Sequence, residues 1–389
     1  NHWVNSSYLQ CAITCRNGLF VYWRTCRKDS NPVAKTSALR ETIRTMPIDH
    51  ISTAFVIGAG RMGRRHIEIC KRAGLKVIGV FDANIESLRI AQDEYQIEAN
   101  YIFNDFDLMC ASAIPDYAVV ATTTPSHYEF GVAIAKHGVK YLMIEKPFCS
   151  SIRKCLDLTS LCEKSGIRLA INHYMRFMPM FEYIHALLMS DSFGGFTSLT
   201  VNGGNSGVAN LGSHFIDLFN YFSCSSPRDI SAWLSDEIVP NPRGEKYVDF
   251  GGLIFVQSKN NKRLVIDLPI DQGQGLEILV CGRYGMVRAN IMTGETDAFV
   301  RQEADRDLPL TRSDLGNKVI NRNFGELDLV NITAGHVKKL VKGGEIVDGR
   351  TAMEVISVLS GAHLSNEQNH STQFLNKLDQ VFDREFMWA

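Results

Sequence analysis

The 389-residue chain has 45% hydrophobic and 21% charged residues, a balance typical of globular proteins. Its length favours two domains over a single core. Lys and Arg number 41 against 42 for Asp and Glu, which argues against nucleic acid or an anionic membrane as the main partner. The sequence contains no apolar stretch close to the roughly 20 residues that a membrane-spanning helix needs.

The ten cysteines are scattered along the sequence. They form no C-x-x-C pair and no Cys/His cluster with zinc spacing, so we expect no metal site. Free thiols favour a reduced, cytoplasmic protein. Residues 1–45 show no clean helical or strand period, and we expect a poorly ordered extension there.

From residue 53 onward, short apolar strands alternate with helical segments. The pattern predicts strands at 53–57, 77–81, 101–103, 117–121, 141–144 and 168–171, with helices between most of them, among them 85–95, 128–137 and 152–165. Continuous apolar strands that alternate with helices indicate a parallel sheet covered on both faces. We therefore predict an α/β fold whose N-terminal part, residues 46–172, is a doubly wound Rossmann domain.

After residue 172 the rhythm changes to consecutive strands. These are expected at 197–201, 229–234, 248–257, 263–268, 276–281 and 286–289, followed by helices at 330–342 and 351–365. Strands without intervening helices predict an α+β domain with a mostly antiparallel open sheet over residues 173–389. Substrate binding and oligomerisation are expected to reside there.

The strongest local signal is Gly58-Ala59-Gly60-Arg61-Met62-Gly63, which follows a predicted strand and opens a predicted helix. Gly58 allows a tight turn, Gly60 lets the backbone approach a pyrophosphate, and Gly63 lets the helix pack on the sheet. Asp82 ends the next strand, at the spacing expected for a ribose ligand, and its charge favours NAD over NADP. The alternative is a glycine turn that binds nothing.

A second group of polar residues follows the fourth and fifth strands. Thr122 to His127 come after one strand and Glu145-Lys146-Pro147 after the next, at the sheet edge where doubly wound folds bind ligands. A lysine fixed there can donate to a substrate hydroxyl or a developing alkoxide. From spacing alone, a solvated Glu–Lys ion pair is the better interpretation.

Together these motifs resemble the glucose–fructose oxidoreductase and inositol dehydrogenase family, Gfo/Idh/MocA. The resemblance also covers Thr124-Pro125-Ser126-His127, Glu145-Lys146-Pro147-Phe148, Arg176-Phe177-Met178-Pro179 and Gly212-Ser213-His214-Phe215-Ile216-Asp217. It extends from residue 53 to the C-terminus. The three motif regions in order are far more specific than any one of them.

The resemblance implies a hydride transfer between a nicotinamide and a carbinol carbon of a sugar-like substrate. Lys146 would orient the reacting hydroxyl and His214 would be its acid/base, since imidazole titrates near neutral pH. The family usually carries Asp four residues before this histidine, where this chain has Asn210. An amide can orient a hydroxyl but cannot stabilise an imidazolium by charge.

The same resemblance assigns further residues to the cofactor and the substrate. The cofactor set is Gly58, Gly60, Arg61, Met62, Gly63, Asp82, Thr122, Thr124, Pro125, His127, Glu145 and Lys146. The substrate set is Asn172, Tyr174, Arg176, Asn210 and His214. Asp217 is expected to support its helix, and a homodimer or homotetramer is expected.

Two other functions remain open from the sequence. The first is a catalytically silent NAD-binding sensor or partner subunit, which the Asn210 substitution keeps open. The second is a reductase that acts on another C=O or C=N substrate. Fold alone does not choose among the three.

Overall fold

The computed structural model describes residues 52–388, except 205, 239, 240, 242, 274 and 310–316. The extension expected at residues 1–45 lies outside the described residues. Residues 50–389 form one compact unit, and the description below concerns its described part.

The first half of this unit is built on a six-stranded parallel sheet. Its strands are β1 (Thr53–Ile57), β2 (Lys76–Phe81), β3 (Ile102–Phe103), β4 (Tyr117–Val120), β5 (Tyr141–Ile144) and β6 (Arg168–Ile171). The order in the sheet is β3-β2-β1-β4-β5-β6, with every neighbouring pair parallel. This is the doubly wound order, and the chain reverses direction across the sheet between β1 and β4, where such folds bind ligands. The predicted Rossmann fold is confirmed.

Five helices connect these strands: α1 (Arg61–Ala73), α2 (Ile85–Tyr95), α3 (Phe106–Ser112), α4 (His127–His137) and α5 (Ile152–Lys164). Side chains cap several of them; Asn84 accepts from two amides of α2, and Ser151 accepts from one of α5. Gly60 precedes α1 without a side-chain cap, and no acidic residue follows in its first turn. The amides there remain suited to an anionic ligand.

The second half carries a nine-stranded sheet. Its strands are β7 (Phe196–Asn202), β8 (Pro227–Ile238), β9 (Phe250–Ser258), β10 (Arg263–Leu268), β11 (Glu277–Gly282), β12 (Gly285–Asn290), β13 (Glu295–Arg301), β14 (Asn317–Asn323) and β15 (Gln373–Phe374). The order is β14-β13-β12-β11-β7-β10-β9-β8-β15, and β7 with β10 is the parallel pair among otherwise antiparallel neighbours. The predicted, mostly antiparallel sheet is confirmed.

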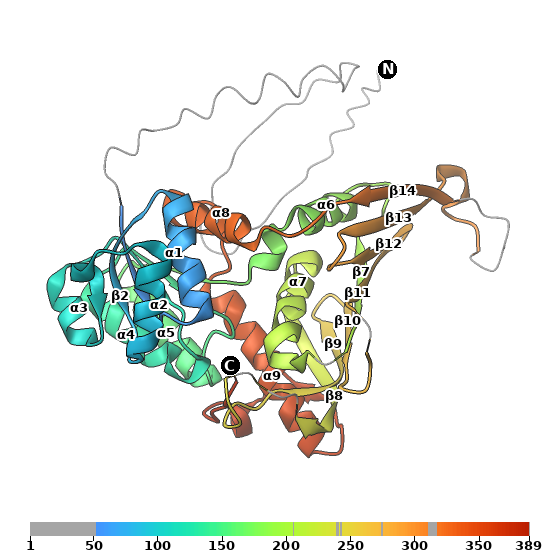
Figure 1. Ribbon diagram of the computed structural model, residues 1–389. Coiled ribbons are helices and arrows are strands. Elements are labelled where there is room, and N and C mark those ends of the chain that lie inside the picture. Colours follow the sequence, from blue (N-terminus) through green and yellow to red (C-terminus); the bar gives the residue numbers. More distant parts are fainter. Residues whose placement is uncertain are drawn as a thin grey trace, which may run out of the picture. The chain divides into compact units, whose positions relative to one another are not determined.

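Four further helices are α6 (Pro179–Leu188), α7 (Ser213–Ser223), α8 (Leu329–Lys342) and α9 (Gly349–Glu367). Helix α7 packs against β7, β10 and α9, and nearly all its side chains are buried. Helix α8 instead packs on α1, as Figure 1 shows. Its Ala334, Val337 and Leu340 join the apolar core beneath the parallel sheet. The C-terminal part of the chain thus returns to the nucleotide-binding fold.

The glycine motif forms the turn between β1 and α1. Gly58 has φ +99°, and an added Cβ there would meet Ala121 backbone atoms at 2.9 Å. A Cβ on Gly63 would overlap the Gly58 carbonyl, whereas Gly60 has no atom within 4 Å of that position. Gly58 and Gly63 therefore hold the turn and helix together, and Gly60 faces open space.

This contrast predicts opposite results for two alanine variants. Gly63→Ala should lower the free energy of unfolding by about 3 kcal/mol, because the helix must move off the turn. Gly60→Ala should cost about 1 kcal/mol or less, since its Cβ meets nothing. Chemical denaturation of the two proteins and the wild type measures both values. Equal destabilisation by the two variants would contradict the assigned packing.

Candidate active site

A large cavity opens where β1 and β4 diverge. Its volume is about 930 Å³. The lining comes from the glycine turn, the end of β2, the segment after β4, and three segments of the second half: Gly58, Gly60, Arg61, Met62, Phe81, Asp82, Ala83, Asn84, Ser87, Ala121, Thr122, Thr123, Ser126, Phe130, Ser206, Asn210, Asn241, Arg243 and Asp249. This volume and position suit a ligand of dinucleotide size.

Asp82 lies at the mouth of this cavity and also stabilises the glycine turn. One carboxylate oxygen accepts from the Ala59 amide at 2.7 Å and the other from the Asn84 amide at 2.8 Å. Each oxygen has a second lone pair, so the carboxylate can still accept from a ribose hydroxyl. The structure places Asp82 beside Gly58 and Gly60, as the sequence predicted.

A smaller cavity of about 190 Å³ adjoins the first. The two share Arg61, Met62, Thr122, Asn210 and Arg243 as lining residues. The smaller one is further lined by Arg65, Ile69, Thr124, Glu145, Lys146, Tyr174, Leu211, His214, Leu329, Val330 and Thr333. Residues as far apart in the sequence as Arg61 and Thr333 therefore line one cavity. The predicted Lys146 and His214 line it as well.

Glu145 sits at the centre of a buried hydrogen-bond network. Its carboxylate bonds His66 Nε2 at 2.6 Å and accepts from Asn172 Nδ2 at 2.8 Å and from the Lys146 amide at 3.2 Å. Burial by itself raises the pKa of a carboxyl. Here the hydrogen bonds and charge of His66, with those of Asn172 and Lys146, outweigh burial and hold the pKa of Glu145 at about 2.

The side chain of Lys146 crosses from β5 to the second half of the unit. Its Nζ donates to the Asn210 backbone carbonyl at 2.8 Å and to Asn210 Oδ1 at 2.7 Å. Burial lowers the pKa of Lys146 to about 8, with further lowering by Arg243 and Arg61 against the opposing charges of Glu145 and Asp249. The ammonium therefore remains charged at neutral pH but can release its proton more readily than an ordinary lysine.

His214 lies in the first turn of α7 and is 2% exposed. Its ring packs against Tyr174 at 4.7 Å and edge-on against His173 at 5.4 Å between centroids. Its Nδ1 is buried and has no hydrogen-bond partner among the described residues. Burial, together with the charges of Lys146 and His173, lowers the pKa of His214 well below its usual value. The imidazole is thus neutral at physiological pH.

Among the described residues Asn210 forms no hydrogen bond to His214, although both line the smaller cavity. Residues Gly207–Gly212 form a π-helical turn before α7. A π turn contains more residues than an α turn, so a spacing of four no longer places two side chains on one face. The Asn210 side chain binds Lys146 instead, and its effect on the site acts first through the lysine.

Asp249 stabilises this π turn through hydrogen bonds to its backbone. Its carboxylate accepts from the Ala209 amide at 2.8 Å and the Asn210 amide at 2.7 Å. Gly207 has φ +65°, and a side chain there would overlap the same carboxylate. Burial raises the pKa of Asp249 to about 6, against the lowering effect of these amides and of Lys146. The carboxylate fixes Asn210, and Asn210 in turn holds Lys146.

Several predicted residues support the site without lining either cavity. Arg176 forms a buried two-point ion pair with Asp217 of α7, with Nε–Oδ2 2.9 Å and Nη2–Oδ1 2.5 Å. His127 is buried, with Nδ1 facing the carbonyls of Pro147 and Phe148 and Nε2 that of Thr122. These contacts join the two loops that follow β4 and β5.

Three more of the predicted residues, Gly63, Pro125 and Asn172, are also absent from the cavity linings. Asn172 acts through Glu145, to which it donates. We assign these residues and those of the preceding paragraph positioning roles.

Sequence reasoning missed the residues that reach the site from distant segments. Arg243 and Asp249 come from the connection between β8 and β9, and Thr333 comes from α8. Tyr247, on the same connection, donates to Thr123 Oγ1 at 3.1 Å and fastens that loop beside the cofactor cavity. No local pattern marks these residues, because their role depends on how the chain returns to the parallel sheet.

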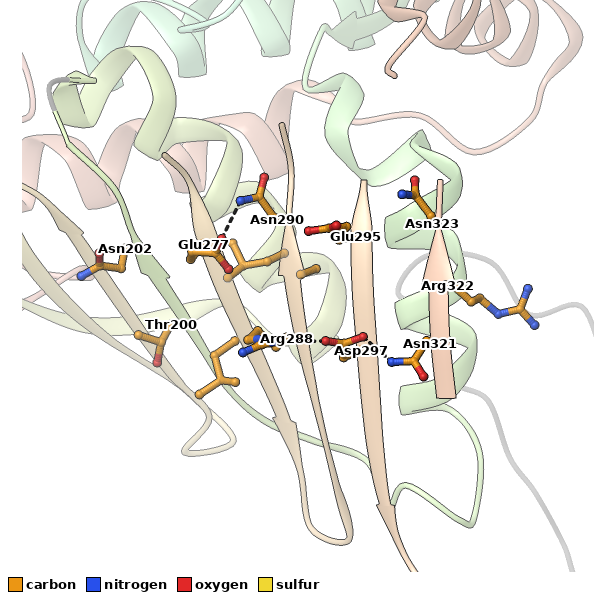
Figure 2. Close-up of a pocket in the computed structure, with 13 residues that line it drawn as sticks. Thr200, Asn202, Glu277, Arg288, Asn290, Glu295, Asp297, Asn321, Arg322 and Asn323 are labelled. Carbon is orange, nitrogen blue, oxygen red and sulfur yellow. Dashed lines mark hydrogen bonds and ion pairs between the residues drawn. The ribbon is translucent and has the colours of Figure 1, made fainter. Parts of the chain in front are cut away.

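A third cavity, of about 970 Å³, lies on the open face of the nine-stranded sheet. Figure 2 shows its polar side chains, many of them paired across strands. Asp297 binds Arg288 at 2.9 Å and Asn321 at 2.6 Å, and Glu277 accepts from Asn290 at 2.5 Å. Because these charges already have partners, and none of the glycine-turn residues takes part, we do not assign the active site to this face.

The described residues contain no group of three or more His, Cys, Asp or Glu side chains suited to a metal ion. Within them, no helix is both long and apolar enough to cross a membrane.

Comparison with known proteins places this architecture in a defined class. Residues 53–173 match the model of an oxidoreductase family with an NAD-binding Rossmann fold. D-apiose dehydrogenase of Paraburkholderia graminis is 26% identical over 140 residues, 36% of each chain. An inositol 2-dehydrogenase/D-chiro-inositol 3-dehydrogenase of Halalkalibacterium halodurans is 30% identical over 123 residues, 31% of this chain and 35% of that protein. The chain thus matches about a third of the length of these relatives.

Solved structures extend the likeness to nearly the whole described chain. Levoglucosan dehydrogenase in complex with NADH and levoglucosan aligns with a TM-score of 0.69 and 15% identity, covering 84% of this chain and 100% of that one. An Agrobacterium radiobacter oxidoreductase in complex with NAD⁺, L-tartaric acid and magnesium aligns with a TM-score of 0.70 and 16% identity, covering 84% and 99%. At these identities the likeness shows the shared two-sheet fold.

The structure combines a Rossmann sheet, a cavity of dinucleotide size at its switch point, and an open mixed sheet. Residues 53–173 match the Gfo/Idh/MocA family model, as the motifs of that segment indicated.

The buried Glu145 network predicts how stability depends on pH. The folded pKa of about 2 lies below the ordinary glutamate value of 4.5, so the ionised carboxyl stabilises the fold above pH 4.5. That contribution, about 3 kcal/mol, is lost as pH falls from 4.5 towards 2. Glu145→Gln should therefore flatten the dependence of unfolding free energy on pH in this window. Denaturant titrations from pH 2 to 6 measure it.

The exposed Glu98 supplies the control for this measurement. Glu98→Gln should leave the dependence of unfolding free energy on pH unchanged. A wild-type slope retained in Glu145→Gln would show that other groups cause the acid sensitivity.

Proposed function

We propose that the chain is an NAD(P)-dependent oxidoreductase that transfers a hydride between nicotinamide and a hydroxyl-bearing carbon of a sugar, nucleotide-sugar or cyclitol. The observation that carries this proposal is the contact between the two cavities. Lys146 and His214 line the smaller one, which shares five lining residues with the larger cavity at the glycine turn. A nicotinamide ring at the junction would face both side chains.

The residues present fit a dinucleotide. Gly60 leaves open space above the uncapped N-terminus of α1, where a pyrophosphate would bind backbone amides. Asp82 is placed to accept from a ribose hydroxyl, which favours NAD over NADP. When bound, the nicotinamide would accept or supply the hydride.

The relatives support a polyhydroxylated substrate. The matched proteins are named as dehydrogenases of D-apiose and inositols, and a structural neighbour was solved with levoglucosan. In this chain the smaller cavity presents Lys146, Tyr174 and Asn210, whose polar atoms suit hydroxyl groups. Which of these sugars or cyclitols reacts is left to the experiments below.

The protonation states assign a role to each group. His214 is neutral at physiological pH and can accept the hydroxyl proton as the carbinol carbon is oxidised. Lys146 is charged and can stabilise the alkoxide that develops on that oxygen. In the reverse direction the imidazolium of His214 would return that proton to the oxygen, while the ammonium of Lys146 again stabilises the alkoxide. Asn210 holds Nζ in place through two hydrogen bonds.

The expected homodimer or homotetramer stays a prediction. The open face of the nine-stranded sheet is the surface that the family resemblance implies for subunit contacts. Sedimentation or light scattering would decide the assembly state.

The role of Lys146 predicts a loss of turnover without a loss of cofactor affinity. Lys146→Met should lower kcat by about a hundredfold or more with NADH affinity unchanged, because the ammonium acts on the reacting oxygen. In the wild type kcat/KM should fall above pH about 8, as Lys146 loses its proton. Steady-state kinetics with a panel of sugars and cyclitols, together with NADH titration, measures both.

Lys136→Met, at an exposed position on α4, is the matched control. Turnover by Lys146→Met close to the wild-type rate would assign the lysine to structure. NADH binding without turnover on any substrate would favour the catalytically silent alternative.

The position of Asp82 predicts cofactor preference. NADH should bind more tightly than NADPH, because the carboxylate accepts from the ribose hydroxyls and repels a 2′-phosphate. Asp82→Asn keeps much of the side chain's shape and should reduce the ratio of NADH to NADPH affinity by about tenfold or more. Calorimetric titration of both cofactors tests it. Tighter NADPH binding by the wild type would refute the assignment.

A further inference from the structure

The smaller cavity has an unusual balance of charge. Its lining includes four cationic side chains, Arg61, Arg65, Lys146 and Arg243, and one carboxylate, Glu145. His214 adds no charge, because its pKa lies well below the usual value. The lining therefore carries a net charge of +3 at neutral pH. Partly enclosed walls of low dielectric strengthen the field of such a cluster.

The carboxylates of the site offset this cluster only in part, through the charges of Glu145 and Asp249 on Lys146 and of Glu145 on Arg243. Glu145 is held by His66, Asn172 and its own chain. Asp249 is held by two backbone amides of the π turn. Within the part of the chain that the structure describes, no carboxylate lies within ion-pair distance of Arg61, Arg65 or Arg243. The cations are thus available to a ligand.

A bound dinucleotide would account for only part of this charge. Arg61 and Arg243 line both cavities and can serve a pyrophosphate. Arg65 and Lys146 line the smaller cavity and are absent from the lining of the larger one. Arg65 lies one turn further along α1, and its charge acts on the hydroxyl of Tyr174. Lys146 is assigned to the reacting oxygen, whereas Arg65 has only a weak bond from its Nη1 to Met62 Sδ at 3.7 Å and no role in the proposed reaction.

We propose that the substrate of this site is an anionic sugar, a monosaccharide that carries a carboxylate or phosphate, and that Arg65 binds that group. The inference rests on the proposed function, because it concerns the substrate of the same site. A volume of about 190 Å³ suits a single sugar ring with a small anionic substituent. The guanidinium of Arg65 offers paired N–H donors that match either anion.

The carboxylate and the phosphate are distinguished by the choice of probes. D-glucuronate and D-glucose 6-phosphate share a ring with neutral D-glucose and differ from it in the charged group. UDP-glucose carries the phosphates on the anomeric oxygen instead and extends beyond one ring. Steady-state kinetics with NAD⁺ on these four compounds, for wild type and Arg65→Gln, shows whether the site prefers a carboxylate or a phosphate.

The expected result is a kcat/KM at least tenfold higher for one of the anionic compounds than for D-glucose. Arg65→Gln should remove that advantage mainly through KM, with kcat and NADH affinity little changed. Lys71→Gln, which removes one charge from an exposed position on the same helix, should have no effect. Raising the salt concentration should weaken binding of the anion more in the wild type than in Arg65→Gln, because three cations remain in the variant.

Two outcomes would overturn the proposal. One is a neutral sugar used as well as its charged counterparts. The other is an equal loss of kcat on neutral and anionic compounds in Arg65→Gln, together with a shift in the pH above which kcat/KM falls. Arg65 would then act by changing the pKa of Lys146. If no compound turns over, binding of D-glucuronate and D-glucose 6-phosphate to the NADH complex is measured by calorimetry. Binding that depends on Arg65 would then support the anion site although the proposed reaction fails. Absence of binding would refute the anion site.

Discussion

The buried carboxylate of Glu145 is the constraint around which the site is arranged. It lies at the end of β5 and is bonded to His66 of α1 and to Asn172 after β6. A charge removed from water is tolerated only when its oxygens are fully used. The hydrogen bonds of Glu145 therefore fix α1 relative to the ends of β5 and β6. The backbone of Lys146, the next residue, is fixed with them.

From that base the site extends into the second half of the unit through Lys146 and Asn210. The lysine bonds Asn210, Asn210 is held by Asp249, and Asp249 occupies the space left by Gly207. Each member fixes the next, so the position of the ammonium depends even on Gly207, which lines neither cavity. Such support is what keeps a reacting group within the tolerance that catalysis needs.

Local patterns in the sequence predicted much of the parallel sheet. β1, β5 and β6 match the expected ranges, because buried parallel strands read as short apolar runs closed by turns. β14, with the sequence NKVINRN, was not predicted, because most of its side chains are exposed and its apolar content is low. The seven-residue α3 was also missed, since it buries only Met109.

The site was predicted where motifs are contiguous and missed where the chain returns from afar. Gly58, Lys146 and His214 were found because each sits in a recognisable local pattern. Arg243 and Thr333 approach through tertiary packing, which no local window records. The π turn before α7 was not predicted.

The packing of α8 on α1 bears on the order in which the protein is made. The six strands of the parallel sheet end at Ile171, but the apolar side chains that cover one flank of α1 come from residues 329–342. During synthesis the nucleotide-binding fold would leave the ribosome with that flank uncovered. Exposed apolar surface on a nascent chain invites chaperones or aggregation. Completion of the fold therefore waits for one of the last helices to be translated.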